Sequence, residues 1–104
     1  MSRPLTVLDG AEADIDHAVD WYEGQLPGLG DSFYSQVART LDAIEQFPES
    51  YQRDFGMVRR AVTQRFPYAV FYRVLPDVVQ VVAILDCRLD PSVIRSRIDA
   101  QSRH

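Results

Sequence analysis

The sequence predicts an α+β domain in which an antiparallel two-helix hairpin packs on a small, mainly antiparallel sheet of about four strands. A first strand precedes the hairpin and a short helix follows the sheet. Apolar residues recur at helical spacing between residues 10 and 47, and β-rich segments with short connections occupy residues 57–86. No Gly-, Ser- or Pro-rich stretch divides the 104 residues, so residues 1–104 are expected to form one domain.

The first strand is expected over residues 3–8, ending at the turn signal Asp9-Gly10. Asp9 is predicted to cap the following helix, with Glu12 completing a capping box. This helix is expected over residues 10–25. Its apolar positions recur every three or four residues, and acids, including Asp14, fill the other positions. The apolar positions are Ala11, Ile15, Ala18, Val19, Tyr22 and Leu26.

A second helix follows the break at Pro27-Gly28-Leu29-Gly30, with Asp31 or Ser32 expected to accept its first N–H groups. Its apolar side chains form one stripe, and Pro48 ends it. The stripe comprises Phe33, Val37, Leu41, Ile44 and Phe47. Two helices joined by so short a turn form an antiparallel hairpin, and the apolar stripe needs a surface to cover it.

The sheet supplies that surface through strands predicted at residues 57–64, 68–75 and 78–86. Pro76-Asp77 is expected to be the turn of a hairpin between the last two. In the final strand, simple alternation puts Val79, Val81, Ala83 and Leu85 on one face. After Asp90-Pro91, Ile94 and Ile98 predict a short C-terminal helix that carries Arg95, Arg97 and Arg103.

Charge is distributed unevenly along the chain. The formal net charge is −4, yet residues 1–52 hold ten acids against two arginines and residues 53–104 hold five acids against nine. All eleven basic residues are Arg, which codon bias and selection for Arg chemistry explain equally well. Guanidinium groups are permanently charged forks that suit phosphates and carboxylates. We expect them to be displayed on the sheet surface that the helical hairpin leaves uncovered.

Composition also excludes several classes of protein. The single Cys87 cannot close an intramolecular disulfide, and Met1 to Pro4 shows no basic-then-apolar leader, so a cytoplasmic location is expected. The longest apolar run, residues 78–85, is too short to span a bilayer. The sequence offers no metal-ligand cluster, nucleophile triad or phosphate loop, so no metal, no other cofactor and no membrane partner are expected.

Several local phrases, in their order and spacing, resemble the RelE/ParE superfamily of type II toxin–antitoxin toxins, also called plasmid stabilisation proteins. They cover almost the whole chain: Ala13-Asp14-Ile15, Trp21-Tyr22-Glu23, Pro27-Gly28-Leu29-Gly30 with Phe33, Phe47-Pro48, Val58-Arg59-Arg60, Phe66-Pro67-Tyr68-Ala69-Val70-Phe71-Tyr72-Arg73-Val74, and Arg88 with Asp90-Pro91. The resemblance implies a helical hairpin on a small sheet and a cognate antitoxin that wraps and neutralises the toxin in a hetero-oligomer. It leaves the target open between DNA gyrase and the ribosome with its mRNA.

Some relatives cleave mRNA in the ribosomal A site with basic side chains plus a Tyr or His near the C-terminal end, and others poison gyrase without known chemistry. Where many relatives carry a His two residues before the Arg that matches Arg88, this chain has Asp86. It has no Tyr after Tyr72 and no Lys. The ParE-like, gyrase-inhibiting branch is therefore favoured over the ribosome-dependent mRNA endonuclease. A non-toxic remnant that only binds antitoxin is a further alternative.

Four arginines are the expected contacts with target or antitoxin: Arg59, Arg60, Arg73 and Arg88. Arg59 and Arg60 are adjacent on a strand and should point to opposite faces. If the chain is instead a nuclease, Arg73 or Arg88 would supply the cation for the phosphate and Asp86 the base. An Asp beside an Arg has a lowered pKa, which makes it a poor general acid.

Overall fold

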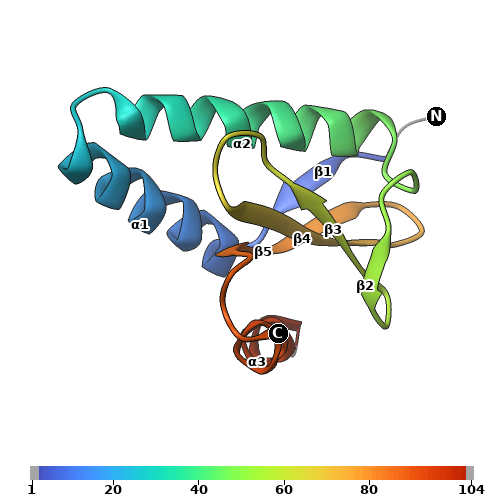
Figure 1. Cartoon of the computed structure of the whole chain (residues 1–104). Coiled ribbons are helices and arrows are strands. Elements are labelled where there is room, and N and C mark those ends of the chain that lie inside the picture. Colours follow the sequence, from blue (N-terminus) through green and yellow to red (C-terminus); the bar gives the residue numbers. More distant parts are fainter. Residues whose placement is uncertain (1–2, 103–104) are drawn as a thin grey trace.

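The fold has two helices on one side of a sheet and a third helix on the other (Figure 1). This computed structural model describes residues 3–102, so Arg103 lies outside the described residues. The elements, in chain order, are β1 (Leu5–Val7), α1 (Asp9–Gln25), α2 (Leu29–Gln46), β2 (Arg53–Phe55), β3 (Val58–Val62), β4 (Tyr68–Val74), β5 (Val79–Asp86) and α3 (Pro91–Ser102). No helix within residues 3–102 is both long and apolar enough to cross a bilayer.

The sheet has five strands in the order β1-β5-β4-β3-β2, one more than the sequence predicts. β1 runs parallel to β5, and the other neighbours are antiparallel. The missed strand is β2, which has only three residues, pairs irregularly with β3 and contains no period-2 apolar pattern. It forms because the chain turns back at Gly56, whose φ of 52° is easily adopted only without a Cβ.

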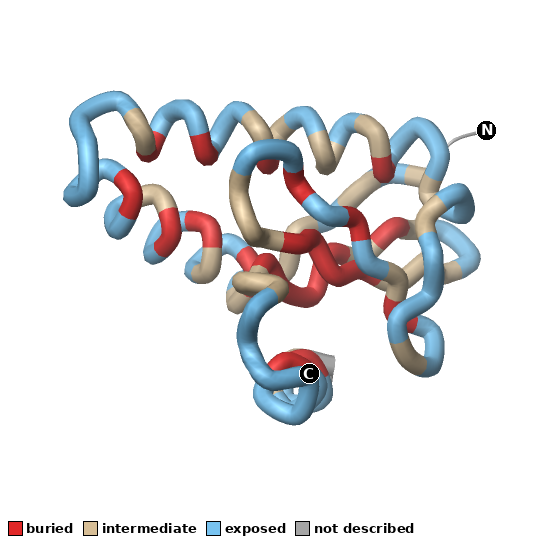
Figure 2. The backbone as a smooth tube through the Cα atoms, viewed as in Figure 1, coloured by how far each residue is buried: buried red, intermediate tan, exposed pale blue. Residues whose placement is uncertain are grey.

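One face of the sheet is covered by the α1–α2 hairpin, as predicted. Most of the predicted stripe residues of both helices are buried against inward-facing residues of β3, β4 and β5, which Figure 2 shows as buried segments on the inner side of each helix. Leu26 and Phe47, the last predicted residue of each stripe, are instead 59% and 64% exposed, because each follows the end of its helix. Tyr22 of α1 packs within about 5 Å of the Phe33 and Phe66 rings. Tyr22 stacks on Phe33 and meets Phe66 edge-on, two ring arrangements that the charge distribution of aromatic rings favours in addition to the apolar burial.

The opposite face of the sheet carries a second apolar cluster, which corrects the expectation that it is uncovered. Ile94 and Ile98 of α3 are buried there, packed with Phe71, Val82 and other residues of the strands. A two-sided sheet explains why β4 and β5 are apolar on nearly all positions. On this face of the sheet, arginine side chains can therefore be displayed only where α3 does not cover the strands.

A bulge in β5 overturns the predicted alternation of its faces. Phe71 pairs with Ala83 while Tyr72 pairs with Val81, so Val82 is an extra residue. Val79 and Val81 face the helical hairpin, whereas Ala83 and Leu85 lie with the α3 cluster. An inserted residue exchanges the two faces for every residue that follows it in the strand. The four residues predicted to share one face of β5 are therefore divided between both faces.

The helix starts also differ from the predicted caps. α1 begins at Asp9 with Leu8 in the capping position, because the Leu8 N–H still pairs with the Val81 carbonyl of β5. α2 begins at Leu29, and two N–H groups at its start are satisfied from the preceding helix. The Glu23 carboxylate accepts hydrogen bonds from the Gly28 and Gly30 N–H groups at 3.0–3.1 Å. Asp31 thus lies inside the first turn of α2.

Candidate binding surfaces

The four arginines predicted to bind do not share one surface. Arg59 pairs with Tyr72 and Arg60 with Phe71 across the β3–β4 ladder. Tyr72 belongs to the cluster under the helical hairpin and Phe71 to the cluster under α3, so Arg59 and Arg60 point to opposite faces, as expected. Arg88 lies beyond the end of β5.

Arg59 is half-buried and holds the segment that follows α2. Its Nη1 donates to the Tyr51 carbonyl at 2.6 Å and to the Glu49 carbonyl at 3.3 Å. Nearby, the Tyr72 hydroxyl donates to the Pro48 carbonyl at 2.6 Å, and burial raises the pKa of Tyr72 to about 12. These bonds fix the path of residues 48–51 against the sheet.

Arg60 and Arg73 share the face that α3 partly covers. Arg60 is exposed, and Arg73 is half-buried with its Nη2 donating to the Gln80 Oε1. Its Nε is buried and has no hydrogen-bond partner within residues 3–102. Of these two arginines, Arg60 is the one that presents its charge openly on this face.

Asp86 and Arg88 form a closed ion pair at the end of β5. Arg88 donates from Nε and Nη2 to the two carboxylate oxygens at 3.0 and 2.8 Å, and its backbone N–H adds a third bond at 2.8 Å. These hydrogen bonds from Arg88 lower the pKa of the Asp86 carboxyl. The predicted base and the predicted cation thus neutralise each other.

A half-buried ion pair between Asp14 and Arg97 was missed by sequence reasoning, which placed Asp14 among solvent-facing acids. The Asp14 carboxylate accepts two hydrogen bonds from Arg97 of α3, at 2.7 and 2.9 Å, and one from the Ile84 N–H of β5, at 3.0 Å. Its position carried a signal, because residue 14 follows Ala11 by three and precedes Ala18 by four, on the buried stripe of α1.

Three arginines meet where α2 ends, and sequence reasoning identified only Arg59 among them. Arg3, Arg53 and Arg59 line a hollow of about 320 Å³ together with Glu49. Arg53 and Arg59 are direct partners across the β2–β3 ladder. Because Arg53 lies on the unpredicted β2, its position opposite Arg59 could not be read from the sequence. We call Arg3, Arg53 and Arg59 the arginine cluster.

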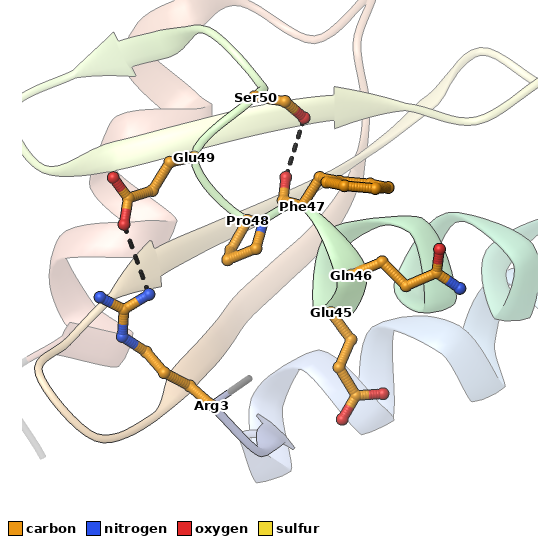
Figure 3. Close-up of a pocket in the computed structure, with 7 residues that line it drawn as sticks. All are labelled: Arg3, Glu45, Gln46, Phe47, Pro48, Glu49 and Ser50. Carbon is orange, nitrogen blue, oxygen red and sulfur yellow. Dashed lines mark hydrogen bonds and ion pairs between the residues drawn. The ribbon is translucent and has the colours of Figure 1, made fainter. Parts of the chain in front are cut away.

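A second hollow, of about 490 Å³, adjoins the arginine cluster and shares Arg3 and Glu49 with it. Figure 3 shows the Arg3 guanidinium turned toward the Glu49 carboxylate, with 3.4 Å between Nη1 and Oε1. The Phe47 side chain, 64% exposed, lines the same hollow. The Arg3–Glu49 pair thus lines both hollows, and Phe47 gives the second hollow an apolar side.

A groove of about 400 Å³ runs between α1 and the end of β5. Its walls include Trp21 of α1, which is 59% exposed, Leu89 beyond β5, and Asp86. Trp21 lines the groove while its neighbour Tyr22 is buried in the core. The two side chains differ because adjacent residues on a helix point in different directions.

The sequence profile described as "ParE toxin of type II toxin-antitoxin system, parDE" matches residues 5–91, from β1 to the start of α3. The chain belongs to the ParE toxin family. Two curated ParE relatives, each named Toxin ParE2, come from Mycobacterium tuberculosis strains CDC 1551 / Oshkosh and ATCC 25618 / H37Rv. Each is 25% identical over 103 residues, which are 98% of this chain and 98% of the relative.

The ParE fold is also found in a solved structure described as the chromosomal ParDE TA system from P. aeruginosa. It matches with a TM-score of 0.72 and 21% identity, over 79% of this chain and 92% of that one. The predicted superfamily and its ParE-like branch are therefore confirmed. In this ParE-family chain the sequence-predicted site residues fall at three separate places: the end of α2, the α3 face and the end of β5.

Proposed function

We propose that this chain is the toxin of a type II toxin–antitoxin pair, neutralised by a cognate antitoxin, and that it inhibits DNA gyrase by binding rather than by catalysis. Family membership supports the toxin–antitoxin role, and the P. aeruginosa structure is described as a toxin–antitoxin system. The choice of binding over catalysis depends on the chemistry available at the end of β5.

The observation that carries the binding mechanism is the closed Asp86–Arg88 pair. Cleavage of RNA through its 2′-hydroxyl needs a base, a cation for the phosphate and an acid for the leaving oxygen. Both carboxylate oxygens of Asp86 are occupied by Arg88, and the lowered pKa of Asp86 leaves no proton to donate at neutral pH. The Tyr72 hydroxyl is committed to the Pro48 carbonyl, and its pKa is raised.

Gyrase supercoiling with the purified full chain tests this proposal. We expect loss of supercoiling together with a trapped gyrase cleavage complex, and no new 5′ ends when ribosome-bound mRNA is analysed by primer extension. New mRNA ends that vanish in Arg73→Ala would overturn the binding mechanism in favour of the endonuclease. Unimpaired growth when the chain is induced without its antitoxin would reject toxicity and favour the remnant.

A further inference from the structure

The arginine cluster holds more positive charge than its surroundings compensate. Arg53 and Arg59 are directly opposite in the β2–β3 ladder, an arrangement in which like charges repel. Arg3 lines the same hollow, and Glu49 is the one acid among its lining residues. Within residues 3–102, the Arg53 side chain makes no ion pair or hydrogen bond. An anion in the hollow would relieve the repulsion.

The present counterion is weakly held. The Glu49 side chain is 62% exposed, and its oxygen lies 3.4 Å from the Arg3 guanidinium, at the long end of ion-pair distances. Exposed ion pairs of this kind contribute little to stability, so the carboxylate of a ligand could compete with Glu49 for Arg3. Hydrogen bonds to the Tyr51 and Glu49 carbonyls fix the Arg59 guanidinium, so this part of the site is already in place before a ligand binds.

The rest of the hollow is apolar, which indicates the kind of anion that fits. Met57, 58% exposed, lines it together with Val74, Leu75 and Pro76. A phosphate backbone gains nothing from these groups, whereas an aliphatic side chain next to a carboxylate fits both halves. Met and Arg are also enriched in protein–protein interfaces.

The net charge of the chain also favours a short acidic protein segment over a nucleic acid as the ligand. The chain carries −4 overall, and residues 1–52, which hold α1 and α2, carry ten acids against two arginines. A nucleic acid polyanion would be repelled on approach, while a short acidic segment is repelled much less. Arg53 also lies on β2, the last strand of the sheet, so an extended segment could run along this edge.

We propose that the arginine cluster binds an extended segment of a partner protein in which a carboxylate side chain alternates with an apolar one. The carboxylate pairs with Arg53 and Arg59, and the apolar side chain covers Met57 and Leu75. This site is independent of whether the toxin acts on gyrase or on the ribosome.

Fluorescence anisotropy of the full chain with three labelled probes tests the site. The probes are an acetylated peptide of alternating Glu and Leu, the same peptide with Gln for each Glu, and a thymidine oligonucleotide of equal charge. We expect the Glu peptide to bind at least about tenfold more tightly than the Gln peptide, with the oligonucleotide weakest. Equal binding of the two peptides would refute the site, and tighter, Arg53-dependent binding of the oligonucleotide would reassign it to phosphate.

Two variants separate the site from nonspecific charge. Arg53→Gln should weaken binding of the Glu peptide about tenfold. Arg39→Gln, which removes an exposed arginine on α2, should leave the affinity for this peptide unchanged. Relief of the Arg53–Arg59 repulsion should also raise the unfolding midpoint of Arg53→Gln by about 1–4 °C at low salt. An equal loss of binding in both variants would show general charge attraction and reject the proposal.

Discussion

At the residue scale, the same amino acid serves different purposes in this protein because neighbouring groups differ. Arg97 and Arg59 are used structurally, bonding Asp14 and backbone carbonyls, respectively. Arg88 neutralises Asp86, and Arg53 has no counterion within the described residues. Charge composition alone could not distinguish these roles, because each depends on which acceptor lies within about 3 Å.

Arg88→Gln should raise the pKa of Asp86 toward the ordinary range of an aspartate. The shift follows because hydrogen bonds from Arg88 are the largest cause of the lowered value. A carboxyl whose pKa is depressed by folding stabilises the native state above its unfolded pKa and loses that contribution as pH falls through the folded pKa. Titration of the Asp86 carboxyl carbon by NMR measures this directly.

The matched control for this titration is Arg95→Gln, which removes an α3 cation that lies over the ring of Phe55 in β2. It should leave the Asp86 titration unchanged. An Asp86 midpoint that does not move in Arg88→Gln would mean that the ion pair is absent in solution, and the case against acid–base chemistry would lose its basis.

At the element scale, the α1–α2 hairpin depends on close approach at one glycine and on a cap supplied across the turn. Gly28 has a φ of 90°, a left-handed conformation that favours glycine. A Cβ on Gly30 would lie 2.8 Å from the Val19 carbonyl oxygen, so α2 can lie this near α1 only without that side chain. The segment Pro27-Gly28-Leu29-Gly30 thus does more than end α1, because its glycines permit the left-handed turn and the close packing of α2 on α1.

Two glycine substitutions in this hairpin should have opposite effects on stability. Gly30→Ala should lower the free energy of unfolding by about 1–3 kcal/mol, because the new methyl overlaps α1 backbone. Gly24→Ala should raise it by about 0.5–1 kcal/mol, since nothing lies within 4 Å of its added Cβ and alanine favours the helix. Urea unfolding followed by circular dichroism checks both signs, and a stabilising Gly30→Ala would contradict the close packing.

At the scale of the whole molecule, Asp14 connects the two faces of the sheet. It lies on α1, above one face, yet bonds Arg97 of α3, above the other, and the Ile84 N–H of β5 between them. The Ile84 N–H follows the stretch of β5 that pairs with β1, so Asp14 supplies the acceptor that β1 no longer provides. Loss of this carboxylate therefore affects three elements together.

Asp14→Ala should lower the free energy of unfolding by about 2–4 kcal/mol, because it leaves the half-buried Arg97 charge and a backbone donor without their partner. Thermal and urea unfolding measure the loss, and Asp16→Ala, exposed on the same helix, should change it by less than about 0.5 kcal/mol. Equal effects of the two substitutions would contradict a connecting role for Asp14.

The sequence by itself determined the order and type of the long elements and the family to which they belong. Helical spacing from Phe33 to Ile44 and the apolar runs of β4 and β5 follow from local periodicity, which burial on one or both faces imposes on any chain. The Pro and Gly punctuation marked the turns for the same reason, since these residues restrict or release φ locally.

Only the tertiary structure decided the start of each helix, the β5 bulge, the presence of β2 and the arrangement of the arginines. Most of these features depend on contacts between residues distant in sequence, since Leu8 is held by Val81 and Asp14 by Arg97. The start of α2 depends on a nearer contact across the turn, in which Glu23 accepts from Gly28 and Gly30. Arg53 and Arg59 become direct neighbours only through a three-residue strand with no apolar period. A periodic pattern reports which face of an element is buried, but pairing between elements is set by the folded chain.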